Sequence, residues 1–135
     1  EVNAPSSMPL ALVDGVQFQQ VIYNLVRNAY QALPAGDGKI TVSIAFNDFE
    51  FRIVIEDNGS GISPETMGAI FEPYRTTKSA GSGLGLLIVR RIIREHGGEI
   101  SIESEAGEGT RVVIHLPRAE RPVRLLGGPD SVIDL

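Results

Sequence analysis

The sequence predicts an α+β fold in two layers, with one mixed, mostly antiparallel sheet and helices packed on one face. Three observations support this prediction. Apolar residues alternate strictly within residues 40–46 and alternate again within 49–56, where Val54 is also apolar. They recur at helical spacing within 15–33 and 84–96, and the elements follow in the order helix, two strands, helix, loop, helix, two strands. Strands joined by short turns pair antiparallel, and the helices then cover a single face of the sheet.

The first helix is predicted over residues 15–33. Asp14 precedes it and is followed three residues later by Gln17, the spacing of a capping box. Pro34 ends the helical pattern, because proline cannot continue a helix. The apolar positions that repeat at helical spacing are Phe18, Val21, Ile22, Leu25, Ala29 and Leu33.

Four strands are predicted, in two pairs. Asn47 and Asp48 turn the chain within the first pair, and the segment Ala106-Gly107-Glu108-Gly109 turns it within the second. The strands are expected at residues 40–46, 49–56, 99–104 and 110–116.

Two more helices are predicted between the strand pairs. Ser63 is typical of an N-cap and the proline after it of a first helical position, so a short helix is expected over residues 64–70. Residues 72–83 are expected to form a lid-like loop. A stronger helix over residues 84–96 ends at the glycine pair that begins with Gly97.

Composition limits the classes of function. The chain has 135 residues, 12 Lys and Arg against 17 Asp and Glu, a net charge of −5, two His and no Cys. The absence of cysteine excludes disulfides, thiolate zinc sites, iron–sulfur clusters and a cysteine nucleophile, and it suits a reducing compartment. The acidic balance argues against binding to nucleic acid. No apolar stretch approaches the ~20 residues that would cross a bilayer.

The length fits a single domain with flanking segments. Residues 1–9 are rich in proline and serine and are interpreted as an N-terminal linker. Residues 10–117 form the predicted domain. Residues 118–135 are interpreted as a C-terminal tail or linker, because they contain further proline and glycine without a clear period.

The first predicted helix carries an unusual uncharged polar stripe. Gln20, Asn24, Asn28 and Gln31 fall on one side of an otherwise apolar helix. Asparagine is a poor helix former, so two of them in mid-helix suggest a specific role. An amide oxygen suits a hard cation, and Mg²⁺ takes few protein ligands when substrate phosphates supply others. The alternative is a hydrogen-bonded seam along the helix.

A second motif follows the second strand. Asp57-Asn58-Gly59-Ser60-Gly61 reads as a tight turn, yet a helix cap rather than another strand comes next. The glycines would then let the backbone approach a flat ligand closely. The carboxylate of Asp57 would accept a hydrogen bond from an exocyclic amine such as that of adenine.

A third motif runs directly into the last helix. Thr76-Thr77-Lys78 and then Gly81-Ser82-Gly83-Leu84-Gly85-Leu86 offer backbone N–H groups, a helix N-terminus and a nearby cation to a phosphate. The alternative is a flexible glycine-rich linker. The spacing fits neither a dinucleotide site nor a P-loop, and no strand precedes the glycines.

Taken together, these motifs resemble the catalytic ATP-binding domain of bacterial sensor histidine kinases. That domain belongs to the GHKL superfamily, with the Bergerat fold, which includes gyrase, Hsp90 and MutL. The resemblance covers residues 14–117, and its motifs occur in the family's order at residues 24–29, 57–62, 71–74, 81–86 and 107–110.

The resemblance implies roles for individual residues. Asn28 would bind Mg²⁺, Asp57 the adenine amine, and the backbone from Gly83 to Leu86 the phosphates, with residues 76–78 in a mobile ATP lid. Asn28 and Lys78 would be the catalytic residues. The implied ATP-binding set is Asn24, Asn28, Gln31, Asp57, Gly59, Gly61, Ile62, Phe71, Tyr74, Thr76, Thr77, Lys78, Gly81, Gly83, Leu84, Gly85, Leu86 and Thr110.

The resemblance also implies an activity. The domain would bind Mg-ATP and transfer the γ-phosphoryl group to a histidine on a separate dimerisation and phosphoacceptor domain, the first step of two-component signal transduction. Asn24 stands where hydrolytic members of the superfamily have a general-base Glu, and an amide cannot accept a proton from water. A hydrolytic GHKL ATPase and a nucleotide-free pseudokinase scaffold are the alternatives.

Neither histidine of the chain fits the family's phosphoacceptor. His96 is expected at a helix terminus and His115 within a strand. The partners implied by the resemblance are therefore a helical phosphoacceptor domain of the same protein and a downstream response regulator. The domain itself is expected to be cytoplasmic and monomeric, within a homodimeric parent protein that a membrane could anchor.

Overall fold

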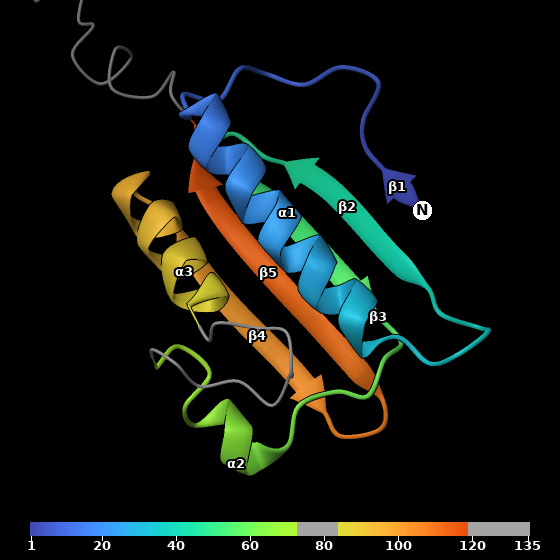
Figure 1. Ribbon diagram of the computed structural model, residues 1–135. Coiled ribbons are helices and arrows are strands. Elements are labelled where there is room, and N and C mark those ends of the chain that lie inside the picture. The colour runs from blue at the N-terminus through green and yellow to red at the C-terminus, as the bar shows by residue number, and fades with distance from the viewer. Residues whose placement is uncertain (73–83, 119–135) are drawn as a thin grey trace, which may run out of the picture.

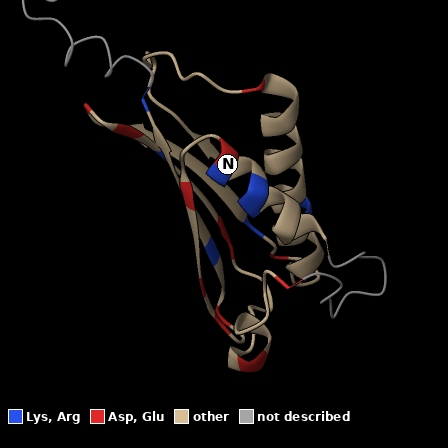
Figure 2. Cartoon of the chain, turned by 90° about the vertical axis from the view of Figure 1, so that its left-hand side faces the viewer, with Lys and Arg blue, Asp and Glu red and all other residues tan. Residues whose placement is uncertain are grey.

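The computed structural model describes residues 1–72 and 84–118, which form a five-stranded sheet with helices on one face (Figure 1). The strand order is β1-β2-β3-β5-β4; β1 is parallel to β2, and the other neighbours are antiparallel. A side view shows the sheet and helix α1 as two layers (Figure 2). The predicted fold class is confirmed. The elements are β1 (Val2–Asn3), α1 (Gly15–Ala32), β2 (Ile40–Phe46), β3 (Glu50–Asp57), α2 (Pro64–Met67), α3 (Gly85–Glu95), β4 (Glu99–Glu105) and β5 (Gly109–Pro117).

The two predicted strand pairs form within a residue of their expected bounds. In the β2–β3 pair, Asn47 closes the turn, because its Oδ1 accepts hydrogen bonds from the backbone N–H groups of Phe49 (2.8 Å) and Glu50 (2.9 Å). This turn sets Ile44 opposite Ile53, so that the apolar side chains of both strands share one face.

Helix α1 begins as its sequence predicts. Asp14 Oδ1 accepts a hydrogen bond from the backbone N–H of Gln17 at 3.0 Å. The backbone N–H of Asp14 donates to Nε2 of His96 at 3.0 Å instead of to a side chain of its own helix. His96 Nδ1 lies 2.7 Å from the carbonyl oxygen of Ile92, which can only accept, so Nδ1 is the donor in this contact and Nε2 the acceptor in the other. His96 therefore joins the end of α3 to the start of α1.

Helix α1 ends at Ala32, one residue before the predicted end. Leu33 is extended, with φ −64° and ψ 145°, because the ring of Pro34 disfavours a helical conformation in the residue before it. Helix α2 is also shorter than predicted and ends at Met67. From Gly68 to Glu72 the chain continues in tight turns, for example with the N–H of Ala69 donating to the carbonyl of Thr66.

The core lies between the sheet and the helices α1 and α3. The largest fully buried side chains are Val21 of α1, Val89 and Ile93 of α3, Ile55 of β3 and Ile114 of β5. Both helices therefore pack over the central strands, as the periodicity of their sequences predicts. None of the helices in the described residues is long and apolar enough to span a membrane.

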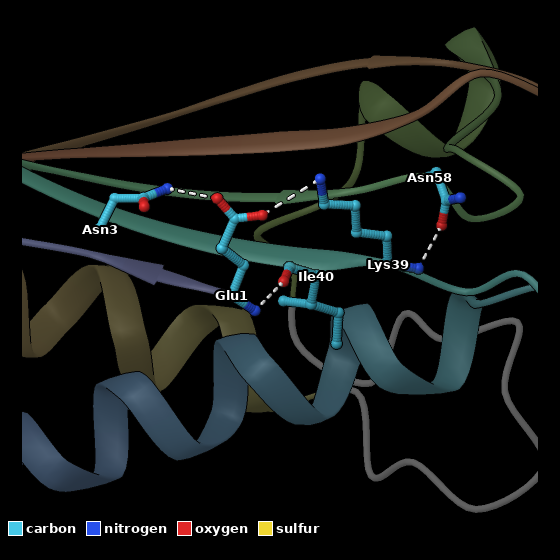
Figure 3. Close-up of polar contacts among 5 residues, drawn as sticks. All are labelled: Glu1, Asn3, Lys39, Ile40 and Asn58. Atoms are coloured by element: carbon cyan, nitrogen blue, oxygen red, sulfur yellow. Dashed lines mark hydrogen bonds and ion pairs between the residues drawn. The ribbon is translucent and has the colours of Figure 1, made fainter.

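Strand β1 was not predicted, since residues 1–9 were interpreted as a linker. The N–H of Val42 donates to the carbonyl of Glu1 at 2.9 Å, and the amino group of Glu1 donates to the carbonyl of Ile40 at 3.0 Å (Figure 3). The Glu1 carboxylate accepts from Asn3 and lies 3.2 Å from Lys39 Nζ. These contacts lower the pKa of Glu1, and the hydrogen bond from Asn3 is the largest single cause, followed by the hydrogen bond and the charge of Lys39. A strand of two residues is too short to show a period of alternating residues, so the sequence contains no signal for it.

The domain boundaries, residues 1–9, 10–117 and 118–135, remain predictions.

Replacing Ile114 with Ala tests the position of the core. Ile114 is fully buried and pairs with Ile53 and Ile100. The substitution leaves a cavity and should lower the free energy of unfolding by about 2–5 kcal/mol, measured by urea denaturation. Val16→Ala is the control, because Val16 is 79% exposed on α1 and should change stability by no more than about 0.5 kcal/mol. Equal effects of the two would contradict this core.

Candidate functional site

A cavity of about 510 Å³ lies between α1, the loop after β3, helix α2 and the start of α3. Its wall is polar where α1 and the end of β3 meet and apolar where the sheet and α3 contribute. The polar side chains include those of Asn24, Asn28, Gln31, Asp57 and Thr110, and the apolar ones include those of Ile55, Ile62, Ile70, Leu86, Ile102 and Val112.

The polar stripe of α1 lines this cavity. Asn24, Asn28 and Gln31 lie on it, and both asparagines are half-buried. Leu25 and Ala29, on the adjoining stripe, are buried in the core. The helix therefore packs on the sheet with one stripe and turns its amides to the cavity with the next, as its 3.6-residue period requires.

Asp57 is the last residue of β3 and is half-buried at the floor of the cavity. Its Oδ1 accepts a hydrogen bond from the N–H of Gly59 at 2.8 Å, which orients the carboxylate. The next residue fastens the loop. Asn58 Oδ1 accepts from the N–H of Lys39 (2.7 Å, Figure 3), and Asn58 Nδ2 donates to the carbonyl of Asp37 (2.8 Å). The Gly59 N–H thus orients the carboxylate, and Asn58 ties the loop that carries it to the backbone of residues 37–39.

The glycines of this loop are required by packing within the protein. A Cβ on Gly59 would collide with the carbonyl oxygen of Ala32, whose position is fixed by a 2.9 Å hydrogen bond from the N–H of Ser60. Gly61 has φ +69°, and a Cβ there would collide with the carbonyl oxygen of Glu105. Gly61 lines the cavity but Gly59 does not. The sequence had suggested close approach to a ligand; the close approach seen is to α1 and β4.

The start of α3 forms the opposite side. Gly85 and Leu86, its first two residues, line the cavity. The first backbone N–H groups of a helix have no partner within the helix, and its dipole favours a negative charge there. This side of the cavity is therefore suited to an anion, whereas the Asp57 side is suited to a hydrogen-bond donor.

Other predicted site residues are placed differently. Gly59, Phe71 and Leu84 are described but do not line the cavity. The ring of Phe71 instead lies under the guanidinium of Arg90, whose central carbon is 4.7 Å from the ring centroid. Six predicted residues lie outside the described part of the chain, and these are Tyr74, Thr76, Thr77, Lys78, Gly81 and Gly83.

Several residues outside the implied ATP-binding set also line the cavity. Gln20 belongs to the amide stripe already recognised in the sequence, and its place in that stripe is the signal for it. Arg27 also lines the cavity, and no role was predicted for it from the sequence. Ser63 and Thr66 belong to α2, where the side chain of Ser63 accepts from the N–H of Thr66 at 3.2 Å. In the sequence Ser63 is accounted for as a helix cap, so nothing there indicated that it and Thr66 also line a cavity.

A second depression follows the outer face of α1. It encloses about 670 Å³ and carries no carboxylate. Figure 2 shows α1 almost without charged residues, and Arg27 is its one charged side chain. The carboxylate of Asp57 and the amide stripe of α1 line the first cavity instead. The groove is lined by Val13, Gly15, Phe18, Gln19, Ile22, Tyr23, Val26, Arg27 and Tyr30.

Residues 13–120 match the family described as histidine kinase-, DNA gyrase B-, and HSP90-like ATPase. The chain belongs to this family. The resemblance inferred from the motifs is therefore confirmed, and the chain is an ATPase-family domain of the kind found in sensor histidine kinases.

Relatives and solved structures of the ATPase family support this assignment. Sporulation kinase D of Bacillus subtilis (strain 168) is 46% identical over 99 residues, which are 73% of this chain and 19% of that protein. This chain thus spans about a fifth of that relative. The nucleotide-free catalytic domain of histidine kinase ThkA has a TM-score of 0.75 at 32% identity, over 87% of this chain and 76% of that one. Full-length ShkA in complex with AMPPNP has a TM-score of 0.73 at 29% identity, over 88% of this chain and 26% of that one.

Gly59→Ala tests the role of the loop glycines. Because a Cβ would strike the carbonyl of Ala32, the variant should lose about 1–3 kcal/mol of unfolding free energy without any ligand present. Gly68→Ala is the matched control, since its nearest contact would be an ordinary 3.7 Å and its φ is −60°. Urea denaturation measures both. An unchanged midpoint for Gly59→Ala would contradict the packing role.

Proposed function

We propose that this chain binds ATP with Mg²⁺ in the cavity between α1, β3 and α3 and acts as the catalytic domain of a sensor histidine kinase. In this proposal it transfers the γ-phosphoryl group to a histidine on a separate phosphoacceptor domain. One observation carries the proposal. Asp57 and the amide stripe of α1 line the same cavity, and the N-terminus of α3 lines its opposite side. The AMPPNP bound by ShkA supports it, since that protein has a similar fold.

The adenine end lies at Asp57. A carboxylate held by the N–H of Gly59 can accept a hydrogen bond from the exocyclic amine of adenine. The apolar side chains of Ile55, Ile62 and Val112 line the same cavity and suit the faces of a flat base. The hydrogen bond to the amino edge of adenine, together with apolar contact on the faces of the ring, would make the cavity selective for this base.

The phosphate end lies further along α1. Asp57 adjoins the C-terminal end of α1 through the Ser60 to Ala32 hydrogen bond, and Asn24 lies eight residues earlier, about 12 Å along the helix axis. Asn28 and Asn24 would face the phosphates with the start of α3. Lys78, outside the described residues, is proposed to add positive charge there.

The donor set fits magnesium held by a nucleotide. Among the described residues, no three His, Cys, Asp or Glu side chains gather into a group able to hold a metal. Asn28 offers an amide oxygen, which suits a hard cation that takes its other ligands from phosphates and water. When bound, Mg²⁺ would neutralise charge on the phosphates. The chain's own residues would orient the γ-phosphoryl group and exclude water.

A histidine acceptor is favoured over water. Asn24 lines the cavity and cannot remove a proton from a water molecule. An imidazole attacks with its own lone pair and needs only a correctly placed phosphoryl group. Steady ATP turnover by the chain alone would favour a hydrolytic ATPase, and nucleotide-independent binding to a helical partner with no ATP binding would favour a scaffold.

The acceptor is proposed to lie on another part of the protein. His96 is engaged by Asp14 and Ile92, and His115 Nδ1 lies 2.9 Å from a carboxylate oxygen of Glu50. The proposed partners are a helical phosphoacceptor domain of the same protein and a response regulator. The proposal also places this domain in the cytoplasm, within a homodimeric parent protein.

Asp57→Ala should weaken ATP binding by at least tenfold, because the cavity then lacks the carboxylate that accepts from the adenine amine. Isothermal titration calorimetry with ATP and ADP measures the dissociation constants. Asp48→Ala is the control, since Asp48 is an exposed carboxylate in the β2–β3 turn. Equal affinities of the wild type and Asp57→Ala would refute the adenine assignment.

Asn28→Ala should remove the part of ATP affinity that depends on Mg²⁺, because the amide oxygen is the proposed ligand of the ion. The same titration is repeated with Mg²⁺ and with EDTA. Gln19→Ala removes an exposed amide from the outer face of the same helix and should keep the Mg²⁺ dependence. A Mg²⁺ dependence in Asn28→Ala equal to that of the wild type would rule out this ligand.

A further inference from the structure

The hydroxyl of Ser104 joins three segments at the base of the cavity. Ser104 lies on β4 opposite Thr110 of β5. Its Oγ is 2.8 Å from each of three atoms: the backbone nitrogen of Ile62, the carbonyl oxygen of Gly109 and Oγ1 of Thr110. The residue itself does not line the cavity, whereas Thr110 and Ile62 do.

The chemistry of these neighbours fixes the direction of each hydrogen bond. A serine hydroxyl has one hydrogen and two acceptor sites. The N–H of Ile62 must donate to it, and the carbonyl of Gly109 must accept from it. The hydrogen of Ser104 is then used, so the third bond is satisfied only if Thr110 donates its hydroxyl hydrogen to Ser104. All three bonds form together in this arrangement alone.

The direction of the last bond determines what Thr110 presents to a ligand. Because its hydrogen points to Ser104, the hydroxyl of Thr110 can only accept hydrogen bonds from the cavity. Thr110 is also the register partner of Asp57 across the β3–β5 pair, and both residues line the cavity. The carboxylate of Asp57 and the hydroxyl of Thr110, which can only accept, thus lie together at the end of the cavity proposed for adenine.

We propose that Ser104 is a positioning residue that orients Thr110 as an acceptor and thereby selects purine nucleotides with a 6-amino group over those with a 6-oxo group. A 6-amino group can donate to both Asp57 and Thr110. A 6-oxo group has no hydrogen to donate, so its lone pairs would face the lone pairs of these two acceptors and repel them. The inference rests on the proposed nucleotide-binding function and deepens it, since it assigns base selectivity to a residue outside the cavity wall.

The test compares ATP with inosine triphosphate, which has the same phosphates and a 6-oxo base, by calorimetry on the 135-residue chain. The wild type should bind ATP more tightly. In Ser104→Ala the hydroxyl of Thr110 is released to donate, so the ratio of the ITP to the ATP dissociation constant should fall by about three- to tenfold. Ser104→Thr retains the hydroxyl and should restore the ratio.

A merely structural role of Ser104 would weaken both nucleotides equally, and an unchanged ratio would overturn the inference. Thr110→Val provides an independent variant that leaves Ser104 in place, and it should also lower the ratio because one acceptor is lost. In the Thr110→Val background, Ser104→Ala should have no further effect on the ratio. A further fall there would also overturn the inference, since Ser104 would then act by another route.

The outcomes separate this inference from the proposed function. If the wild type binds neither nucleotide, the proposed function fails and the inference fails with it. If the wild type binds ATP but does not discriminate against inosine triphosphate, the inference alone is wrong. Urea denaturation of each variant identifies any loss of folding. If Ser104→Ala does not fold, the nucleotide ratios of Ser104→Thr and Thr110→Val test the inference in its place.

Discussion

The packing of α1 across the central strands is the contact on which the rest of the structure depends. The buried core contains Val21, Leu25 and Ala29 from the helix. On the sheet side it contains Ile55 and Ile114. Burial of these side chains removes apolar surface from water, the main favourable contribution to folding. Because a helix has a fixed period, the same contact turns the neighbouring amides toward the cavity. Core and site are two faces of one helix.

The second organising feature is the end of β3, where three distant segments meet. The loop after Asp57 touches the C-terminal end of α1 through Ser60 and Ala32, and touches the β4–β5 turn through the hydrogen bond from the N–H of Gly107 to the carbonyl of Ser60 at 2.7 Å. Few side chains fit between backbones this close, which explains the glycines of the loop. Backbone hydrogen bonds therefore hold the site together on this side.

Much of the fold and part of the site could be predicted from the sequence. The alternation in β2 and β3, the cap at Asp14 and the extended residue before Pro34 are local, so each appears in the order of residues. The amide stripe was recognised for the same reason. By contrast, the resemblance placed Phe71 in the ATP-binding set, but its ring lies under the guanidinium of Arg90 and does not line the cavity. A motif records which residue types recur, and only the packing decides where each side chain points.

The sequence by itself determined the family, the two-layer fold and the positions of Asp57 and the α1 amides, because these depend on periods and short motifs. The tertiary structure alone decided the pairing of β1, the early end of α2 and the hydrogen-bond partners of Ser104. The physical reason is distance along the chain. Ser104 meets Ile62 across 42 residues of sequence, and no local pattern can record which donor will satisfy a hydroxyl that far away. Such contacts exist only once the sheet has formed.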